Sequence, residues 1–141
     1  MARERTFHLS VVTPEGSVLD TEALSVVFPS YDGEYGILPN HAPLLSLLGI
    51  GELRVTRADG TLDRLYLDGG FAQFVDNRLT LVSEQVQPLE HLDPERPAEL
   101  IERARDMRVS NQAMAAARDA AFERARVQRR LLDRRGPSSA T

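Results

Sequence analysis

Hydrophobic and polar residues alternate along most of the first 87 residues, and this alternation is typical of half-buried β-strands. Near the start of the chain, for example, Phe7, Leu9 and Val11 are separated by His8 and Ser10. Many short strands separated by turns predict a β-sandwich or β-barrel and not an alternating α/β sheet. The expected extended segments are residues 6–12, 18–21, 23–29, 35–38, 51–57, 62–67, 71–75 and 78–83.

Residues 32–55 contain the highest density of turn-forming glycine and proline residues in the chain. Glycines at positions 33, 36, 49 and 51 permit backbone angles that other residues avoid, whereas Pro39 and Pro43 fix φ and remove N–H donors. The combination predicts a loop with one defined shape. The run from Leu44 to Leu48 is apolar, so part of it must lie in a core or against a partner.

Two further turns follow in the strand-rich part. Asp59-Gly60 carries a hairpin signal between residues 51–57 and 62–67. Asp68-Gly69-Gly70 is expected to break the strand pattern before residue 71.

The hydrophobic period changes near Pro88, from the spacing of strands to that of helices. Leu100 and Ala104 fall on one helical face, and Pro94 and Pro97 are tolerated only at a helix start, so a first helix should begin between them. Ser110-Asn111 is a stop and cap signal, and residues 112–132 repeat alanine and arginine, which favour helix.

These patterns predict an α+β fold that is mainly β. We expect a β domain at residues 1–87, an antiparallel helical hairpin at residues 88–135 and a flexible tail at residues 136–141. Alanine dominates the helical faces, so the two helices should bury little apolar area.

Charge is divided unevenly along the chain. Residues 1–90 carry six Arg and 13 acidic residues, a net charge of −7, whereas residues 91–141 carry 11 Arg and eight acidic residues, a net charge of +3. Seven of these arginines lie within residues 118–135. They are consistent with a solvated helix face, or with a surface for an acidic partner, a nucleic acid or a nucleotide phosphate.

The residues that usually carry catalysis or bind metal are scattered or missing. The chain has no cysteine, and His8, His41 and His91 have no second ligand at metal spacing. No serine lies in a nucleophile elbow, so we expect neither a catalytic site nor a metal site. No apolar segment approaches the roughly 20 residues of a membrane span, and none has the form of a signal peptide.

Two segments nevertheless match a known family. The run from Gly33 to Leu45, Gly-Glu-Tyr-Gly-Ile-Leu-Pro-Asn-His-Ala-Pro-Leu-Leu, and the run Tyr66-Leu67-Asp68-Gly69-Gly70-Phe71 resemble motifs of the ε subunit of F-type ATP synthase. The resemblance extends to about residue 132. It implies a flattened ten-stranded β-sandwich followed by two helices, in a non-catalytic rotor subunit that couples γ to the c-ring during proton-driven ATP synthesis.

The resemblance also implies where this chain meets its partners. The position of Glu34 approaches the c-ring and that of His41 lies towards γ. The protein would be a peripheral membrane protein on the cytoplasmic face of the bacterial inner membrane, touching the membrane only through the complex, and would bind no nucleic acid. The family's helices inhibit ATP hydrolysis when they extend towards the catalytic α and β subunits.

Some members of the family bind a regulatory ATP on the folded hairpin, and we expect this chain to require no cofactor. The corresponding positions here are Leu92, Asp93, Arg96, Arg103, Arg126 and Arg130. Pro97 replaces the alanine of the family motif and Pro94 is additional, which changes where the helix begins and where Arg96 points. On the residues alone, Asp93 could simply cap a helix.

A rival interpretation uses the same features without the family. The chain would then be a free-standing β-sandwich interaction module whose Arg-rich helix binds an acidic partner or nucleic acid. Binding to γ distinguishes the two interpretations.

Overall fold

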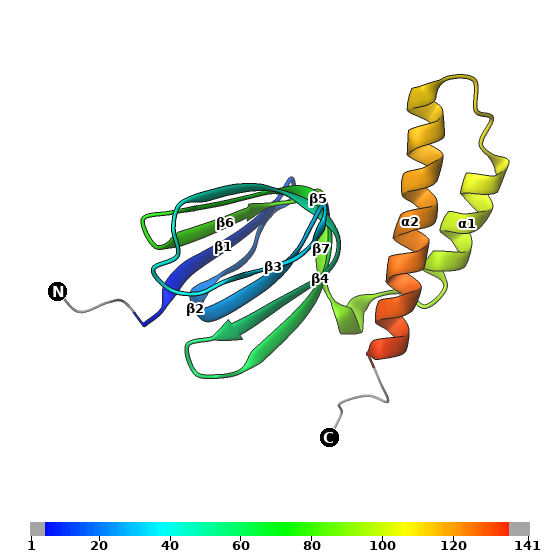
Figure 1. Ribbon diagram of the computed structural model, residues 1–141. Coiled ribbons are helices and arrows are strands. Elements are labelled where there is room, and N and C mark those ends of the chain that lie inside the picture. Colours follow the sequence, from blue (N-terminus) through cyan, green and yellow to red (C-terminus); the bar gives the residue numbers. More distant parts are fainter. Residues whose placement is uncertain (1–4, 136–141) are drawn as a thin grey trace. The chain divides into compact units, whose positions relative to one another are not determined.

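The computed structural model describes residues 5–135, and the chain divides after Pro88 into two compact units (Figure 1). We call Met1–Pro88 the β unit and Leu89–Thr141 the helical unit. Residues 136–141, for which the sequence predicts a flexible tail, lie outside the described residues.

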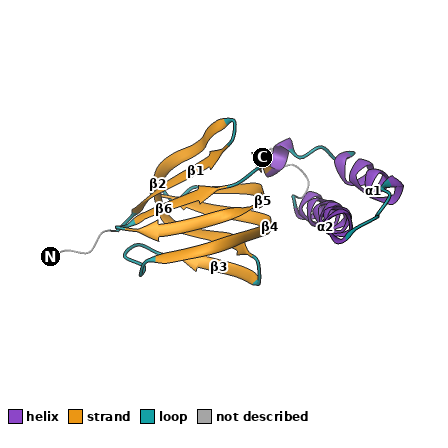
Figure 2. Cartoon of the chain, turned by 90° about the horizontal axis from the view of Figure 1, so that it is seen from above, coloured by secondary structure: helices purple, strands orange, loops and turns teal. Residues whose placement is uncertain are grey.

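The β unit is one seven-stranded sheet that closes on itself (Figures 1 and 2). The sheet order is β1-β6-β5-β4-β2-β3, with β7 paired to β5, and β1 also pairs with β2. Because β1 pairs in parallel with β6 and antiparallel with β2, the sheet forms a flattened barrel and leaves few open edges. The strands are β1 (Phe7–Thr13), β2 (Gly16–Ser30), β3 (Gly33–Ile37), β4 (Leu44–Arg57), β5 (Leu62–Val75), β6 (Arg78–Val82) and β7 (Val86–Pro88).

The barrel encloses the core that the alternating pattern predicts. In β1, Phe7, Leu9 and Val11 are buried and their neighbours are half-buried, as expected. The rings of Phe7 and Phe74 meet edge to face, with centroids 5.6 Å apart. Each fully buried side chain of this size contributes about 1.5–3 kcal/mol of burial free energy.

The three longest strands each change, partway along, the face that they bury. In β4 the inward positions are even-numbered up to Leu48 and odd-numbered from Leu53. In β5 they change from Leu65 and Leu67 to Ala72 and Phe74. In β2 the change accompanies a register shift between residues 23 and 25. Side chains alternate strictly in a regular strand, so each change requires a local bend or bulge.

The family resemblance implies ten strands, and residues 5–135 contain seven. β2 and β5 each join two of the expected extended segments, and β4 joins the expected segment 51–57 to the apolar Leu44–Leu48 run, so counting these three strands twice would give ten. The prediction that Asp68-Gly69-Gly70 ends a strand is wrong. Pairing with β4 continues through it, from Ile50↔Asp68 to Leu48↔Gly70, because the glycines let the strand bend without leaving the sheet.

The helical unit contains a short 3-10 helix, η1 (Leu89–His91), followed by α1 (Arg96–Asp106) and α2 (Gln112–Arg134). Figure 1 shows α1 and α2 as an antiparallel pair. The predicted start of α1 between the two prolines is confirmed, and Asn111 caps α2 by accepting a 2.8 Å hydrogen bond from the Met114 N–H. Neither helix is long and apolar enough to span a membrane, within the residues that the structure describes.

Alanine accounts for two of the seven residues buried on the helices, fewer than the sequence predicts. The buried residues are Pro97, Leu100 and Ala104 on α1 and Ala125, Val127, Gln128 and Leu131 on α2. A contact that the sequence does not reveal closes the open end of the pair. The Arg135 Nη1 donates 3.1 Å hydrogen bonds to the carbonyls of Leu89 and Leu92, which ties the end of α2 to the turn before α1.

We predict that Gly70→Ala will lower the free energy of unfolding by about 4 kcal/mol or more. A Cβ at this position would lie 1.8 Å from the Val82 carbonyl oxygen, on a backbone with φ +109°. Gly69→Ala is the matched control, since its φ is +70° but nothing lies within 4 Å of its added Cβ. The control should cost about 1–2 kcal/mol, the strain of the left-handed backbone alone. Equal losses in urea unfolding would show that the close approach to Val82 is unimportant.

Candidate partner-docking site

The site implied by the sequence lies on β3, on the loop at residues 38–43 and at the beginning of β4. The loop opens with a tight turn in which the His41 N–H donates to the Leu38 carbonyl at 3.2 Å. Pro39 occupies the first central position and Asn40 the second, with φ +68°, which is the pattern of a type II turn. The proline and asparagine therefore specify the path that the sequence predicts to be well defined.

His41 packs inside this loop and is partly buried. Its ring meets the rings of Tyr35 and Phe74 edge to face, each with centroids 5.8 Å away. Its Nδ1 lies 2.7 Å from the Ala42 carbonyl, and its Nε2 lies 3.3 Å from the Tyr35 hydroxyl. A carbonyl can only accept, so Nδ1 carries a hydrogen, and in the neutral ring Nε2 accepts from the hydroxyl. His41 thus holds the shape of the loop.

Glu34 belongs to a row of alternating charges across β3, β4 and β5. Arg54 donates to Glu34 and to Glu52 at 2.9 Å each, and Arg64 donates to the other oxygen of Glu52 at 2.6 Å. The hydrogen bonds from Arg54 to Glu34 and then to Glu52 raise the pKa of the Arg54 guanidinium above its ordinary value. The Glu52 side chain is only 8% exposed, whereas Glu34 is mostly exposed. Glu34 therefore reaches solvent with one cation already beside it.

An apolar patch on β4 and β5 shows which part of the Leu44–Leu48 run lies outside the core, a point that the sequence alone leaves open. Leu45 and Leu47 are 73% and 64% exposed, and Phe71, which pairs with Leu47, is 44% exposed. With Ser46 they line a shallow cavity of about 420 Å³. Alternation was the available signal, because a strand through the Leu44–Leu48 run must turn every second residue away from the core. Exposed apolar surface of this kind usually marks a binding site.

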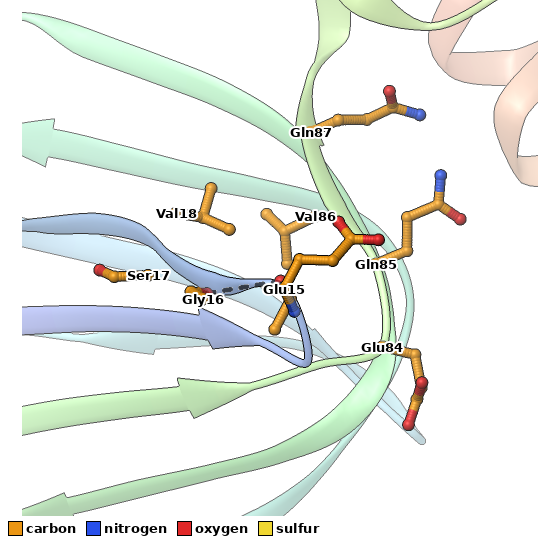
Figure 3. Close-up of a pocket in the computed structure, with 9 residues that line it drawn as sticks. Glu15, Gly16, Ser17, Val18, Glu84, Gln85, Val86 and Gln87 are labelled. Carbon is orange, nitrogen blue, oxygen red and sulfur yellow. Dashed lines mark hydrogen bonds between the residues drawn. The ribbon is translucent and has the colours of Figure 1, made fainter.

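A second cavity, of about 550 Å³, lies elsewhere on the β unit and has a polar lining (Figure 3). Figure 3 shows the side chains of Glu15 and Glu84 extending in different directions, so they do not form a paired acid site. Among residues 5–135, no three His, Asp or Glu side chains are grouped so that they could hold a metal. The residues lining the cavity are Thr13, Glu15, Gly16, Ser17, Val18, Glu84, Gln85, Val86 and Gln87.

The first three of the nucleotide positions lie at the start of the helical unit. Leu92 is buried. Asp93 accepts a 2.9 Å hydrogen bond from the Glu95 N–H, in the turn before α1 and outside the helix itself. Arg96 begins α1 and pairs with Glu99 at 3.3 Å. Asp93 and Arg96 therefore each already interact with a residue that is close to them in the sequence.

The other three nucleotide positions are exposed on the two helices. Arg126 pairs with Glu123 one turn earlier, and Arg103 and Arg130 are exposed. Val127, Gln128 and Leu131 form the buried side of α2. The Arg96 N–H donates to the Asp93 carbonyl at 3.1 Å, but within residues 5–135 no side-chain hydrogen bond or ion pair joins any two of the six positions. Surface ion pairs of the kind made by Arg96 and Arg126 contribute less than about 1 kcal/mol, so a bound anion could displace them.

Comparison with known proteins finds one family along most of the chain. The β-sandwich domain family of ATP synthase delta/epsilon chains matches residues 6–88. The ATP synthase epsilon chain of Desulfitobacterium hafniense (strain DSM 10664 / DCB-2) is 46% identical over 99 residues, which cover 70% of this chain and 74% of the relative. The ATP synthase epsilon chain of Nitratidesulfovibrio vulgaris (strain DP4) is 35% identical over 130 residues, which cover 91% of this chain and 96% of the relative.

Two solved structures share the fold at low sequence identity. A chain of the Euglena gracilis mitochondrial ATP synthase structure superposes with a TM-score of 0.75 at 23% identity, covering 89% of this chain and 82% of that chain. A chain from the central stalk and c-ring structure of the Tetrahymena thermophila mitochondrial ATP synthase superposes with a TM-score of 0.73 at 12% identity. The superposition covers 94% of this chain and 99% of that chain.

Proposed function

The chain belongs to the delta/epsilon chain family of ATP synthase, and from this we infer that it is a non-catalytic subunit of the central stalk of that enzyme. The observation that carries the inference is 35% identity to an epsilon chain over nine-tenths of this chain, helices included. The rival interpretation, a free-standing module that binds an acidic partner or nucleic acid, is not favoured, because it explains neither the shared length nor the shared motifs. The subunit is part of a membrane-associated complex.

The apolar patch is the surface that we assign to γ. A rotor subunit must stay attached while torque passes through it, and apolar side chains that become buried at an interface provide most of such attachment. Leu45, Leu47 and Phe71 supply that surface on two adjacent strands of a closed barrel. His41 lies in the loop that leads into β4 and shapes the edge of the patch. From this position it contacts γ.

The charged row is the surface that we assign to the polar loops of the c-ring. Glu34 is its exposed end and Arg54 holds it in place. An alternating row of charges favours a partner with the matching alternation, which contributes more to specificity than to affinity. In this arrangement the protein lies on the cytoplasmic face of the membrane and touches the bilayer only through the complex.

The helical unit has a regulatory role in this proposal. Its buried faces are small, so the helices separate at modest cost, and α2 presents Arg126, Arg129 and Arg130 to solvent. When extended, this basic face would meet acidic surfaces of the catalytic α and β subunits and inhibit ATP hydrolysis. Regulatory ATP would favour the folded pair, with Arg103 and Arg130 available for its phosphates and Arg96 and Arg126 released from their acidic neighbours.

Replacing the apolar patch tests the attachment to γ. We predict that Leu45→Gln combined with Leu47→Gln weakens binding to the purified γ subunit by tenfold or more, because a central apolar contact contributes roughly 1–2 kcal/mol or more. Leu62→Gln is the control, since Leu62 is 55% exposed but lies outside the patch. Both variants should unfold within about 0.5 kcal/mol of the unmodified chain. Equal affinities of the two variants for γ would refute the assignment.

Ending the chain after Pro88 tests inhibition by the helices. ATP hydrolysis by the assembled enzyme should then rise by about fivefold or more, the usual lower range of an allosteric coupling. The comparison uses complexes that contain equal amounts of this subunit. The truncated chain keeps the β unit, so it should be incorporated in the same amount as the full chain. Unchanged hydrolysis at equal occupancy would reject the inhibitory role.

Titration calorimetry of the full chain tests regulatory ATP. We expect heat of binding that is lost in Asp93→Ala and in Arg126→Ala, because one residue shapes the turn before α1 and the other supplies a phosphate contact. Arg105→Ala, which removes an exposed arginine of α1 outside the six positions, should bind as the unmodified chain does. No heat at millimolar ATP would remove the nucleotide site from the proposal.

A further inference from the structure

Asn77 lies in the two-residue turn between β5 and β6, far in sequence from the docking loop. Asp76 and Asn77 have φ values of +52° and +59°, the left-handed pair of a type I′ hairpin turn. Glycine, asparagine and aspartate are the residues that adopt this backbone with least strain. The turn alone would therefore be satisfied by any of the three residue types.

The Asn77 side chain makes two further contacts that only an amide can make together. Its Oδ1 accepts a 2.8 Å hydrogen bond from the Asn40 N–H, and its Nδ2 donates a 2.8 Å hydrogen bond to the Thr6 carbonyl. The backbone carbonyl of Asn77 also accepts from the His8 N–H at 3.2 Å. Aspartate lacks the donor and glycine lacks both groups, so asparagine alone combines the left-handed backbone with both bonds.

The bond from the Asn40 N–H ties the second central residue of the docking-loop turn to the turn between β5 and β6. The turn at residues 38–41 is closed by the His41 N–H, and the N–H of its second central residue, Asn40, is not used by the turn. The Asn77 Oδ1 supplies the acceptor and so sets the angle at which the turn leaves β3. That angle places the His41 ring against Tyr35 and Phe74 and sets the point where β4 begins.

We propose that Asn77 is the positioning residue of the docking site. By joining the turn at residues 38–41 to Thr6, it holds the loop between Glu34, which precedes the loop, and the apolar patch of Leu45, Leu47 and Phe71, which follows it. It acts through Asn40 and His41 and does not need to touch γ. This inference rests on the proposed attachment of the β unit to γ.

The experiment compares Asn77→Gly and Asn77→Asp with Asp76→Gly in the full chain. Asp76→Gly changes the same turn and the same backbone region, but removes a side chain that does not bridge to the loop. For each variant, hydrogen exchange of the Asn40 amide, the dissociation constant for purified γ, and urea unfolding are measured. All binding is measured where urea unfolding shows each variant to be fully folded.

In Asn77→Gly, the Asn40 amide should exchange about tenfold faster and the affinity for γ should fall about tenfold, as expected for the loss of the paired hydrogen bonds. Asn77→Asp keeps the acceptor for Asn40, so its amide should stay protected and its affinity should lie closer to that of the unmodified chain. Asp76→Gly should change neither property.

Two results overturn the inference, and they differ from each other. If the unmodified chain binds γ and Asn77→Gly binds as tightly as Asp76→Gly, Asn77 is merely a turn residue and the proposed function stands. If the unmodified chain does not bind γ, the proposed function fails and the positioning role fails with it.

Discussion

The double pairing of β1 is the constraint on which the rest of the β unit depends. β1 pairs along one edge with β2 and along the other with β6, which closes the sheet around the core. The parallel pairing His8↔Arg78 places the residues before β1 beside the turn that precedes β6. Asn77 can reach Thr6 only because the sheet is closed. The hydrogen bond between Asn77 and Asn40 then connects the closed sheet to the docking loop.

A closed barrel suits a subunit that rotates with its partners. Such a body resists shear because every long strand is paired on both sides over part of its length, so a load applied at one surface reaches another without local unfolding. Here the charged row of Glu34, Arg54, Glu52 and Arg64 and the apolar patch of Leu45, Leu47 and Phe71 are both built on paired strands. The helical unit lacks a comparable core, which is consistent with the regulatory separation that we propose for it.

Much of this architecture is predictable from local pattern. Alternation identifies the buried residues of β1, and the two prolines and Asn111 locate the helix ends. The strand count is not predictable in this way, because a long strand that changes its buried face looks like two strands with a turn between them. The glycines at these changes, such as Gly69 and Gly70, have the same sequence signal whether they end a strand or bend it.

The candidate site shows the same limit. The motif from Gly33 to Leu45 points to the segment that we propose to dock, yet the exposure of Leu47 depends on which alternate residues of β4 face the core before the strand bends. The contacts of Arg135 and Asn77 are not visible in sequence, since each joins residues at least 37 positions apart through a single side chain. Long-range hydrogen bonds of this kind follow from the fold and have no local pattern.

Thiol protection at position 47 tests the central claim most directly. The chain has no cysteine, so Leu47→Cys carries a single reactive group on the apolar patch. Its labelling by a maleimide should be fast in the isolated chain and strongly slowed in the assembled ATP synthase, whereas Leu62→Cys should react at the same rate in both. Equal labelling of position 47 in the two states would contradict the claim that this patch attaches the subunit to the stalk.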